Sequence, residues 1–279
     1  MPIHDQGYQR YAGSRSAIGK SWQVITRAGV MTMVTKRIFL GLLLWAWAPF
    51  VVRAVIIWGS QAFTQVAFLA PKGDTFRDFL EQQNFFVFVM TLWVGSGLIA
   101  NDRRANALQL YLSKPMTSAE YIAGKLAILF IFLLGVTLLP AMMLLLTQAI
   151  FAGSLTFIRN NLYLIPAITL FSIVQVAIAS TTMLALSSMS KSSRFVGVMF
   201  AGLIFFTLAL FNAIRGITGR TTFAWLSPTA SLEQLGDVIF RVQPRYQVSP
   251  AIAGLTVVVL IAGSIWILMR RVRGVEIVT

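Results

Sequence analysis

The stretch GLIANDRRANALQLYLSKPMTSAEYIAGKL, residues 97–126, separates two long apolar parts of the chain. Six of its thirty residues are charged, whereas residues 84–96 before it and 127–158 after it carry no charge. A membrane-spanning helix needs about 20 consecutive apolar residues, and charged side chains collect in the loops between such helices. The pattern therefore predicts a polar loop outside a membrane, held between two helices that cross it.

The same alternation runs along the whole chain of 279 residues, of which 57% are hydrophobic and only 11% are charged. Each apolar segment approaches the length that crosses a hydrocarbon core of about 30 Å. The predicted fold is therefore an all-α integral membrane domain over 38–269 with six transmembrane helices, at 38–58, 84–100, 126–151, 162–187, 195–214 and 250–269.

The basic residues predict the orientation. Six crossings place both termini on one side, which holds fifteen Lys and Arg residues against seven on the other, with Arg53 inside a span. Cytoplasmic loops are enriched in Lys and Arg. We therefore expect a plasma (inner) membrane protein whose tails, 1–37 and 270–279, both lie in the cytoplasm. The net charge of +14 then reflects orientation, and no nucleic-acid partner is predicted.

The composition argues against several functions. The spans contain no Asp, Glu or His, the groups that ion-coupled transporters use as proton relays or ion ligands. The chain has no cysteine and no HExxH zinc motif. The stretch GSRSAIGKS, 13–21, has five residues between its glycines, whereas a phosphate-binding loop has four. We therefore predict no catalytic, cofactor or metal site in this chain, and an external source of energy.

Arg53 is the only ionisable residue within a predicted span. An intramembrane charge is by default a functional hypothesis. However, Arg53 lies five residues before Trp58, at the outer end of the span, and an Arg side chain can extend that far towards water. The structural interpretation is therefore favoured over the functional one. Pro49, four residues earlier, is expected to kink the same helix.

Within the opening stretch, local signals predict a short amphipathic helix. Asn101 or Asp102 can cap a helix over 102–113, which Pro115 closes. An apolar pair four residues apart shares one face, with a basic and an aromatic side chain beside it: Leu108, Leu112, Arg104 and Tyr111. Such a helix, held between two membrane helices, could serve a partner protein as a lever, or it could lie on anionic lipid.

Two further helix starts are predicted on the cytoplasmic side. Thr117 and Glu120 form a capping box, so the third membrane helix begins before it reaches the bilayer. Near the N-terminus, Ile18, Trp22 and Ile25 share the apolar face of an amphipathic interface helix, which is expected to lie on the membrane surface.

Two helices are also predicted on the opposite side of the membrane. In LSPTASLEQLGDVIF, residues 226–240, Ser227 is the expected cap and Pro228 the first helical residue. Residues 74–83 form the second predicted helix. Both are expected to be interfacial packing elements, with a role as caps over the mouth of a pathway as the less favoured interpretation.

The opening stretch resembles the signature of ABC-2 type transporter permeases, the six-helix membrane subunits of ABC exporters. That family has an acidic–arginine pair after the second span, leucines in the short helix, and then a proline, an aromatic residue and Gly-Lys. In this chain those positions hold Asp102, Arg103, Leu108, Leu112, Pro115, Tyr121, Gly124 and Lys125. The chain departs from the pattern at 106–107, where it has Asn-Ala and many relatives have Gly-Thr.

The resemblance implies that the 102–113 helix is a coupling helix seated in a cleft of a separate ATPase subunit. The implied contact residues are Asp102, Arg103, Arg104, Leu108, Tyr111, Leu112 and Pro115. It also implies that the interface helix touches the ATPase, that this partner and not this chain binds ATP and Mg, and that the permease forms a homodimer or a heterodimer with a similar permease. The expected function is ATP-driven export of a substrate that the sequence does not identify. The alternative is a non-transporting membrane scaffold that recruits cytoplasmic proteins.

Overall fold

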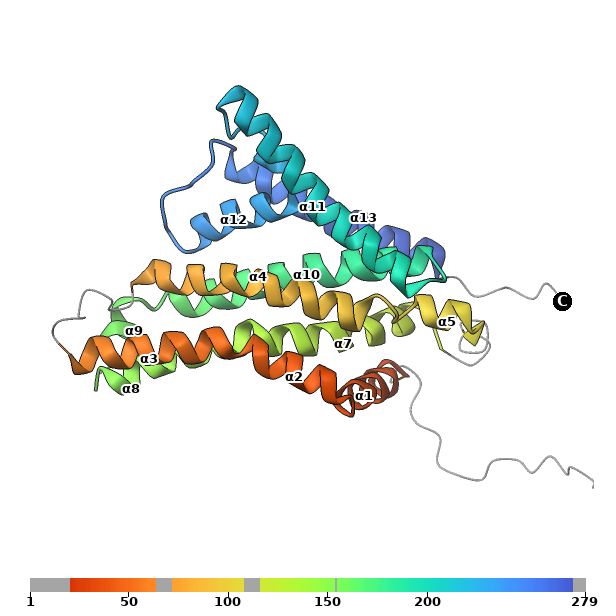
Figure 1. Ribbon diagram of the computed structural model, residues 1–279, viewed down its shortest axis with the longest axis horizontal. Helices are drawn as coiled ribbons and strands as arrows, with labels where there is room; N and C mark the ends of the chain where they lie inside the picture. Colours follow the sequence, from red (N-terminus) through yellow and green to blue (C-terminus); the bar gives the residue numbers. More distant parts are fainter. Residues whose placement is uncertain (1–20, 64–71, 108–115, 154, 273–279) are drawn as a thin grey trace, which may run out of the picture.

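A computed structural model describes residues 21–63, 72–107, 116–153 and 155–272 (Figure 1). The described residues are helical with no strand. Six helical segments are long and apolar enough to cross a membrane: 37–62, 73–104, 118–151, 164–189, 193–218 and 250–271. The predictions of an all-α fold and of six spans are confirmed, and the chain is a multi-pass membrane protein.

The first span is broken in the middle. Helix α2 (Arg37–Ala46) ends at Trp47, and α3 (Ala48–Ala62) carries Pro49 in its first turn. Proline has no N–H to bond to the preceding turn, so a helix does not continue regularly through it. The predicted kink at Pro49 is confirmed, and Figure 1 shows the change of direction between α2 and α3.

The second span begins earlier than the sequence predicted. Helix α4 runs over Gly73–Gly95, so residues 74–83 are its first turns, and the expectation of a separate interfacial helix there is wrong. Phe76, Phe79 and Leu80 on this part of α4 are fully buried. Their packing against the bundle continues the helix into the span despite the charged residues between them. A turn after Gly95 leads to the short helix α5 (Ala100–Arg104).

The third span is also divided, which the sequence analysis did not predict. Helix α7 (Ser118–Val136) is followed after Thr137 by α8 (Leu138–Phe151). Pro140 removes the N–H that would bond to the carbonyl of Val136. At the break, the carbonyl of Leu133 accepts from both the N–H and the hydroxyl of Thr137, at 3.0 and 2.8 Å. A short helix, α9 (Thr156–Asn160), follows α8.

The remaining chain contains three spans and two short helical elements. Helices α10 (Leu164–Met189) and α11 (Ser193–Thr218) are followed by a 3₁₀ turn (Ala224–Leu226), α12 (Pro228–Ile239) and α13 (Pro250–Arg271). The hydroxyl of Ser227 accepts a hydrogen bond from the N–H of Ala230, and Pro228 is the first residue of α12. The predicted cap of this helix is confirmed.

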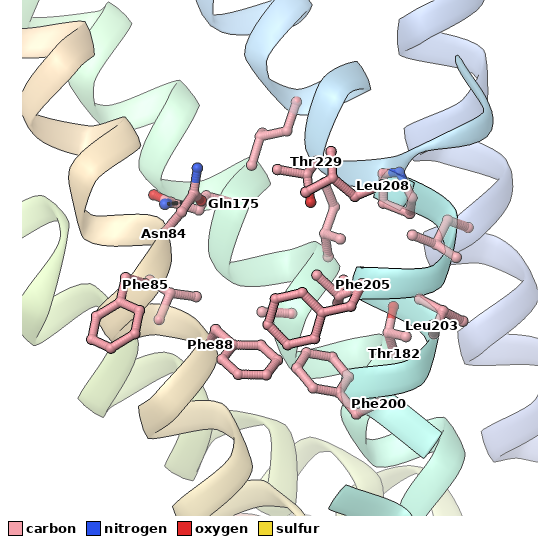
Figure 2. A pocket seen from close by; sticks show the side chains of 17 residues that line it. Asn84, Phe85, Phe88, Gln175, Thr182, Phe200, Leu203, Phe205, Leu208 and Thr229 are labelled. Atoms are coloured by element: carbon pink, nitrogen blue, oxygen red, sulfur yellow. Dashed lines mark hydrogen bonds between the residues drawn. The ribbon is translucent and has the colours of Figure 1, made fainter. Parts of the chain in front are cut away.

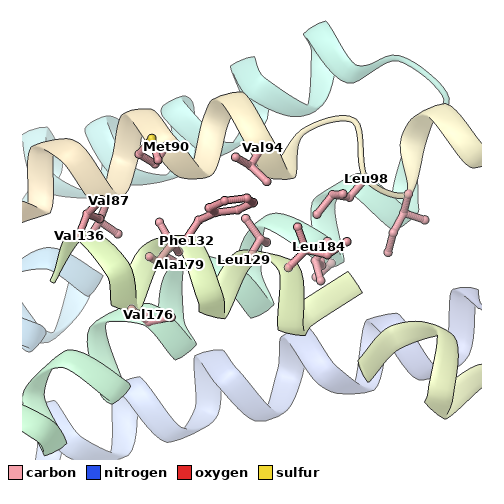
Figure 3. Close-up of a cluster of buried hydrophobic side chains, with 14 of the residues drawn as sticks. Val87, Met90, Val94, Leu98, Leu129, Phe132, Val136, Val176, Ala179 and Leu184 are labelled. Atoms are coloured by element: carbon pink, nitrogen blue, oxygen red, sulfur yellow. The ribbon is translucent and has the colours of Figure 1, made fainter. Parts of the chain in front are cut away.

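Helices α4, α7 and α10 form the centre of the bundle and contact one another. Figure 3 shows the apolar cluster between them, with Val87, Met90 and Val94 from α4, Leu129 and Phe132 from α7, and Ala179 and Leu184 from α10. Helices α2, α3 and α8 flank this centre on one side, and α11, α12 and α13 lie on the other (Figure 1).

Helix α11 lies at the edge of the bundle. Only Val196, Phe200 and Phe211 among its 26 residues are buried, whereas α10 is buried along most of its length. Large apolar side chains of α11 point outward, including Val198, Phe206 and Ile217. An outward apolar face of this kind is suited to contact lipid or another membrane helix.

Candidate functional site

Helix α1 (Ser21–Val34), α5 and the start of α7 lie at the same end of the bundle as the end of α13 (Figure 1). We call the contact between α5 and the first two turns of α7 the α5–α7 junction. It comprises residues 100–104 and 118–125 and connects the two sides of the loop on which the family resemblance rests.

The loop does not begin as one continuous helix. Helix α5 ends at Arg104, and Asn106 has a φ of 53°. A positive φ takes the chain out of the α-helical conformation, and Asn is one of the few residues besides Gly that adopt it readily. Ala107 is helical again. The prediction that a helix begins at 102 and continues to 113 is therefore wrong at its start, because the left-handed turn at Asn106 interrupts it.

Asp102 is the centre of the junction. It lies within α5 and does not cap a following helix. Its carboxylate accepts a hydrogen bond from the hydroxyl of Tyr121 at 2.7 Å and forms an ion pair with Lys125 at 2.7 Å. The side chains of Lys125 and Asp102 are 13% and 19% exposed, and Tyr121 is fully buried. A hydrogen bond to a charged group contributes about 1.5–3 kcal/mol. These contacts therefore hold α5 firmly against α7.

Arg103 connects α5 to a third helix. Its guanidinium donates to the carbonyl of Ser188, near the end of α10. The hydroxyl of the preceding residue, Ser187, accepts from the N–H groups of Ile99 and Ala100, at 3.2 and 3.0 Å, and donates to the carbonyl of Ser96. These bonds satisfy backbone groups left open where α4 ends and α5 begins.

Gly124 allows α1 to approach α7 closely. A Cβ at this position would lie 2.9 Å from Cβ of Ile25 and 3.0 Å from the carbonyl oxygen of Trp22. The hydroxyl of Thr26 donates to the carbonyl of Gly124 at 3.2 Å and is buried there. The predicted interface-helix residues Trp22 and Ile25 thus lie on α1, where Ile25 packs towards the core and Trp22 is 38% exposed.

The other predicted site residues divide into two groups. Thr117 and Glu120 form the predicted capping box, in which each side chain accepts a hydrogen bond from the backbone N–H of the other. Arg104, the last residue of α5, is exposed. Ile18 and four of the implied ATPase contacts lie outside the described residues: Leu108, Tyr111, Leu112 and Pro115.

The junction also contacts α11. Ala100 of α5 packs in one apolar cluster with Met183 of α10 and with Val196 and Phe200 of α11. Ala100, Met183 and Val196 are fully buried, and Phe200 nearly so. A displacement of α5 would therefore press on the beginning of α11 as well as on α7 and α10, because packed interiors transmit strain.

Phe200 further lines an apolar pocket of about 200 Å³ between α4, α10, α11 and α12. Figure 2 shows Phe85 and Phe88 on one wall, Phe200, Leu203 and Phe205 on the other, and Asn84 and Gln175 at one end. The amide of Gln175 donates to the side chain of Asn84 at 2.6 Å and to the carbonyl of Leu80. No charged side chain lines this pocket. Its chemistry suits a neutral, mostly apolar molecule.

The opposite end of the bundle contains an ion-pair network that the sequence analysis missed. Asp237 of α12 is fully buried and accepts hydrogen bonds from Arg77 at 2.9 Å and from Arg245 at 2.8 and 3.0 Å. Arg245 also pairs with Glu81 at 2.6 Å. Burial disfavours the charged guanidinium, but the carboxylates of Asp237 and Glu81 outweigh it and raise the pKa of Arg245. The network ties α4 to α12 and to the segment that follows it.

A neighbouring hydrogen bond belongs to the same network. The hydroxyl of Tyr246 donates to Glu233 at 2.6 Å, and burial together with this carboxylate raises the pKa of Tyr246. The sequence carries no local signal for this network, because 160 residues separate Arg77 from Asp237.

Among the described residues, no group of three His, Asp or Glu side chains could hold a metal ion. No protein-family model matches the chain, and no curated protein matches it.

Proposed function

We propose that the chain is the membrane subunit of an ATP-binding cassette exporter of the ABC-2 type, driven by a separate ATPase subunit that binds ATP and Mg. The observation that carries this proposal is the cluster of Asp102, Tyr121 and Lys125. It joins the two membrane helices on either side of the loop that the partner would hold. Three of the residues that resemble the family signature thus act together in one contact.

The junction supplies a physical route for coupling. A partner that moves the loop would move α5 and α7 together, because Asp102 binds both Tyr121 and Lys125. Arg103 would carry the motion to α10, and Ala100 would carry it to α11. Helices α10 and α11 both line the apolar pocket, so movement of the loop would change its shape. This is how hydrolysis on another subunit could act on a substrate in the membrane.

The departure from the family pattern at Asn106 agrees with the proposal. Asn106 has positive φ, and the corresponding position in many relatives is Gly, the residue that adopts this conformation at least cost. Asn is the usual substitute for Gly at such a position. The exchange therefore preserves the backbone turn that separates α5 from Ala107.

The proposal includes a second permease, either an identical copy or a similar chain, and an orientation with α1, α5 and the C-terminal end of α13 in the cytoplasm. The outward apolar face of α11 offers a surface for such a partner. The larger number of basic residues at the end that carries α1 and α5 supports the orientation, and supports insertion in the plasma (inner) membrane.

Copurification tests the proposal. The tagged chain, solubilised in mild detergent, is expected to bring down an ATP-binding cassette ATPase and to stimulate its hydrolysis. Replacing Leu108 and Leu112 by Ala is expected to weaken this binding at least tenfold. A fully buried leucine contributes about 2–5 kcal/mol, losses at interfaces are usually smaller, and about 1.4 kcal/mol is a factor of ten. The matched control replaces Gln109 and Ser113 by Ala in the same segment.

Each outcome has a defined meaning. If no ATPase copurifies, the proposal fails. If the leucine variant binds the ATPase as tightly as the control variant, those two side chains do not face the partner. If an ATPase binds but nucleotide does not change the distances between the membrane helices, the chain is a scaffold that recruits cytoplasmic proteins and not a transporter.

A further inference from the structure

A groove of about 560 Å³ lies on the outer surface of the bundle, beside the break between α2 and α3. It is bounded by α2, α3 and α4 and lies towards the end of the bundle away from α1 and α5 (Figure 1). Its lining is apolar along most of its length and polar at one end. The apolar part includes Trp45, Val52, Ile56 and Phe86, and the polar part includes Arg53 and Gln82.

Arg53 is held in the groove by α4. Its Nη1 donates to the carbonyl of Thr75 at 3.1 Å, and its Nη2 donates to the side chain of Gln82 at 3.4 Å. The guanidinium carbon lies 5.8 Å from the centre of the Phe79 ring. These contacts position the guanidinium but use only two of its five N–H groups. The expectation that Arg53 simply extends to water is therefore incomplete, because its partners belong to the protein.

The positive charge of Arg53 has no ion-pair partner among the described carboxylates. Asp78 is near enough to interact with it electrostatically, but the carboxylate of Asp78 is bound to Arg77 at 2.7 Å. Both hydrogen-bond acceptors of Arg53 are neutral. A charge in apolar surroundings is costly unless an opposite charge compensates it. The groove therefore offers an anion a guanidinium with unused donors.

We propose that this groove binds an anionic lipid from the surrounding bilayer, with its phosphate on Arg53 and Gln82 and an acyl chain along Trp45, Val52 and Ile56. Arg pairs with phosphate through two parallel hydrogen bonds. The three apolar side chains are 51%, 58% and 41% exposed, so the groove has apolar surface for a chain as well as a site for a headgroup. A free phosphate ion would occupy only the headgroup site and would leave the apolar surface uncovered. The proposal does not depend on the transport function.

The test uses the purified full-length chain after removal of lipid. Thermal unfolding is followed while phosphatidylglycerol, phosphatidylcholine with the same acyl chains, or inorganic phosphate is added. Phosphatidylglycerol is expected to raise the midpoint at lower concentration than the other two. In Arg53→Gln, which keeps hydrogen-bond donors for Thr75 and Gln82, its half-saturating concentration is expected to rise at least tenfold. Arg159→Gln removes an exposed charge from the same end of the bundle and is expected to leave the response unchanged.

A second measurement reports on the acyl chain. Phosphatidylglycerol with brominated chains quenches nearby tryptophan, and the part of the quenching contributed by Trp45 is obtained from the difference between the parent and Trp45→Phe. Quenching of Trp45 is expected to be stronger with brominated phosphatidylglycerol than with brominated phosphatidylcholine. In Arg53→Gln, the two lipids are expected to quench Trp45 equally. If Arg53→Gln does not fold, Arg53→Lys is measured in its place and is expected to bind with reduced affinity, because it keeps the charge without the planar fork.

Three results would overturn the proposal. Equal responses to phosphatidylglycerol and phosphatidylcholine would show that the headgroup charge is not recognised. An equal response to inorganic phosphate would show an ion site without a lipid. An equal loss of affinity in Arg159→Gln and Arg53→Gln would show that net charge, and not the groove, attracts the lipid.

Discussion

Replacing Gly124 by Ala is predicted to separate α1 from α7. The new methyl group would lie 2.9–3.0 Å from Ile25 and from the backbone of Trp22, whereas carbon atoms in contact are normally about 3.5–4.0 Å apart. The helices must therefore move apart by about 0.5–1 Å, and adding a methyl group to a packed site costs about 1–3 kcal/mol. A methyl group added to Gly135, on the same helix, would meet no neighbouring side chain within 4 Å, so Gly135→Ala is the matched control.

The assay uses the absence of native cysteine. Thr26 faces Gly124 and is 7% exposed, so Thr26→Cys is expected to react slowly with a maleimide when α1 is docked. A loss of 1–2 kcal/mol changes a two-state population by a factor of about 5–30. Gly124→Ala is therefore expected to speed labelling by about that factor, and Gly135→Ala is expected to leave it unchanged. Equal labelling rates in the two glycine variants would refute the close packing of α1 on α7.

Two further predictions concern the orientation in the membrane and the network around Asp237. Cysteine at the exposed Gln243 is expected to react with an impermeant reagent added outside intact cells, whereas cysteine at the exposed Lys191 is not; the reverse pattern contradicts the orientation. Ser231, although on α12, is buried and unsuitable for this assay. Asp237→Asn is expected to lower stability by about 1.5–3 kcal/mol in detergent, because it removes the fully buried carboxylate that both Arg77 and Arg245 bind, whereas Asp78→Asn, at a side chain 48% exposed, is expected to cost about 0–1 kcal/mol. Similar unfolding midpoints for these two variants would contradict the central role of Asp237.

The six spans and two of the helix caps could be predicted from the sequence, because their signals are local. The six spans follow from length and hydropathy, which bilayer thickness sets. The caps at Thr117 and Ser227 follow from hydrogen bonds that close within three residues. The break at Thr137 also has a local signal, because Pro140 follows it by three residues.

The features that depend on tertiary contacts were not recovered. Asn101 or Asp102 was expected to cap a helix, because Asn and Asp at a helix start commonly do so. The ion pair of Asp102 with Lys125 depends on how α5 folds back on α7, which the spacing alone does not give. Residues 74–83 were expected to form a separate helix because they are charged, but burial of their apolar face joins them to α4. The network around Asp237 connects segments far apart in the chain.

We propose that ATP hydrolysis on a partner subunit moves the membrane helices of this chain. Spin labels on cysteines at Lys72, before α4, and at Arg220, after α11, report the separation of two helices that line the apolar pocket. Both positions are exposed, and the chain has no other cysteine. In the complex with the ATPase, the distance distribution is predicted to shift between the nucleotide-free state and the state trapped with ATP and vanadate. An unchanged distribution, with hydrolysis confirmed in the same sample, would contradict the claim.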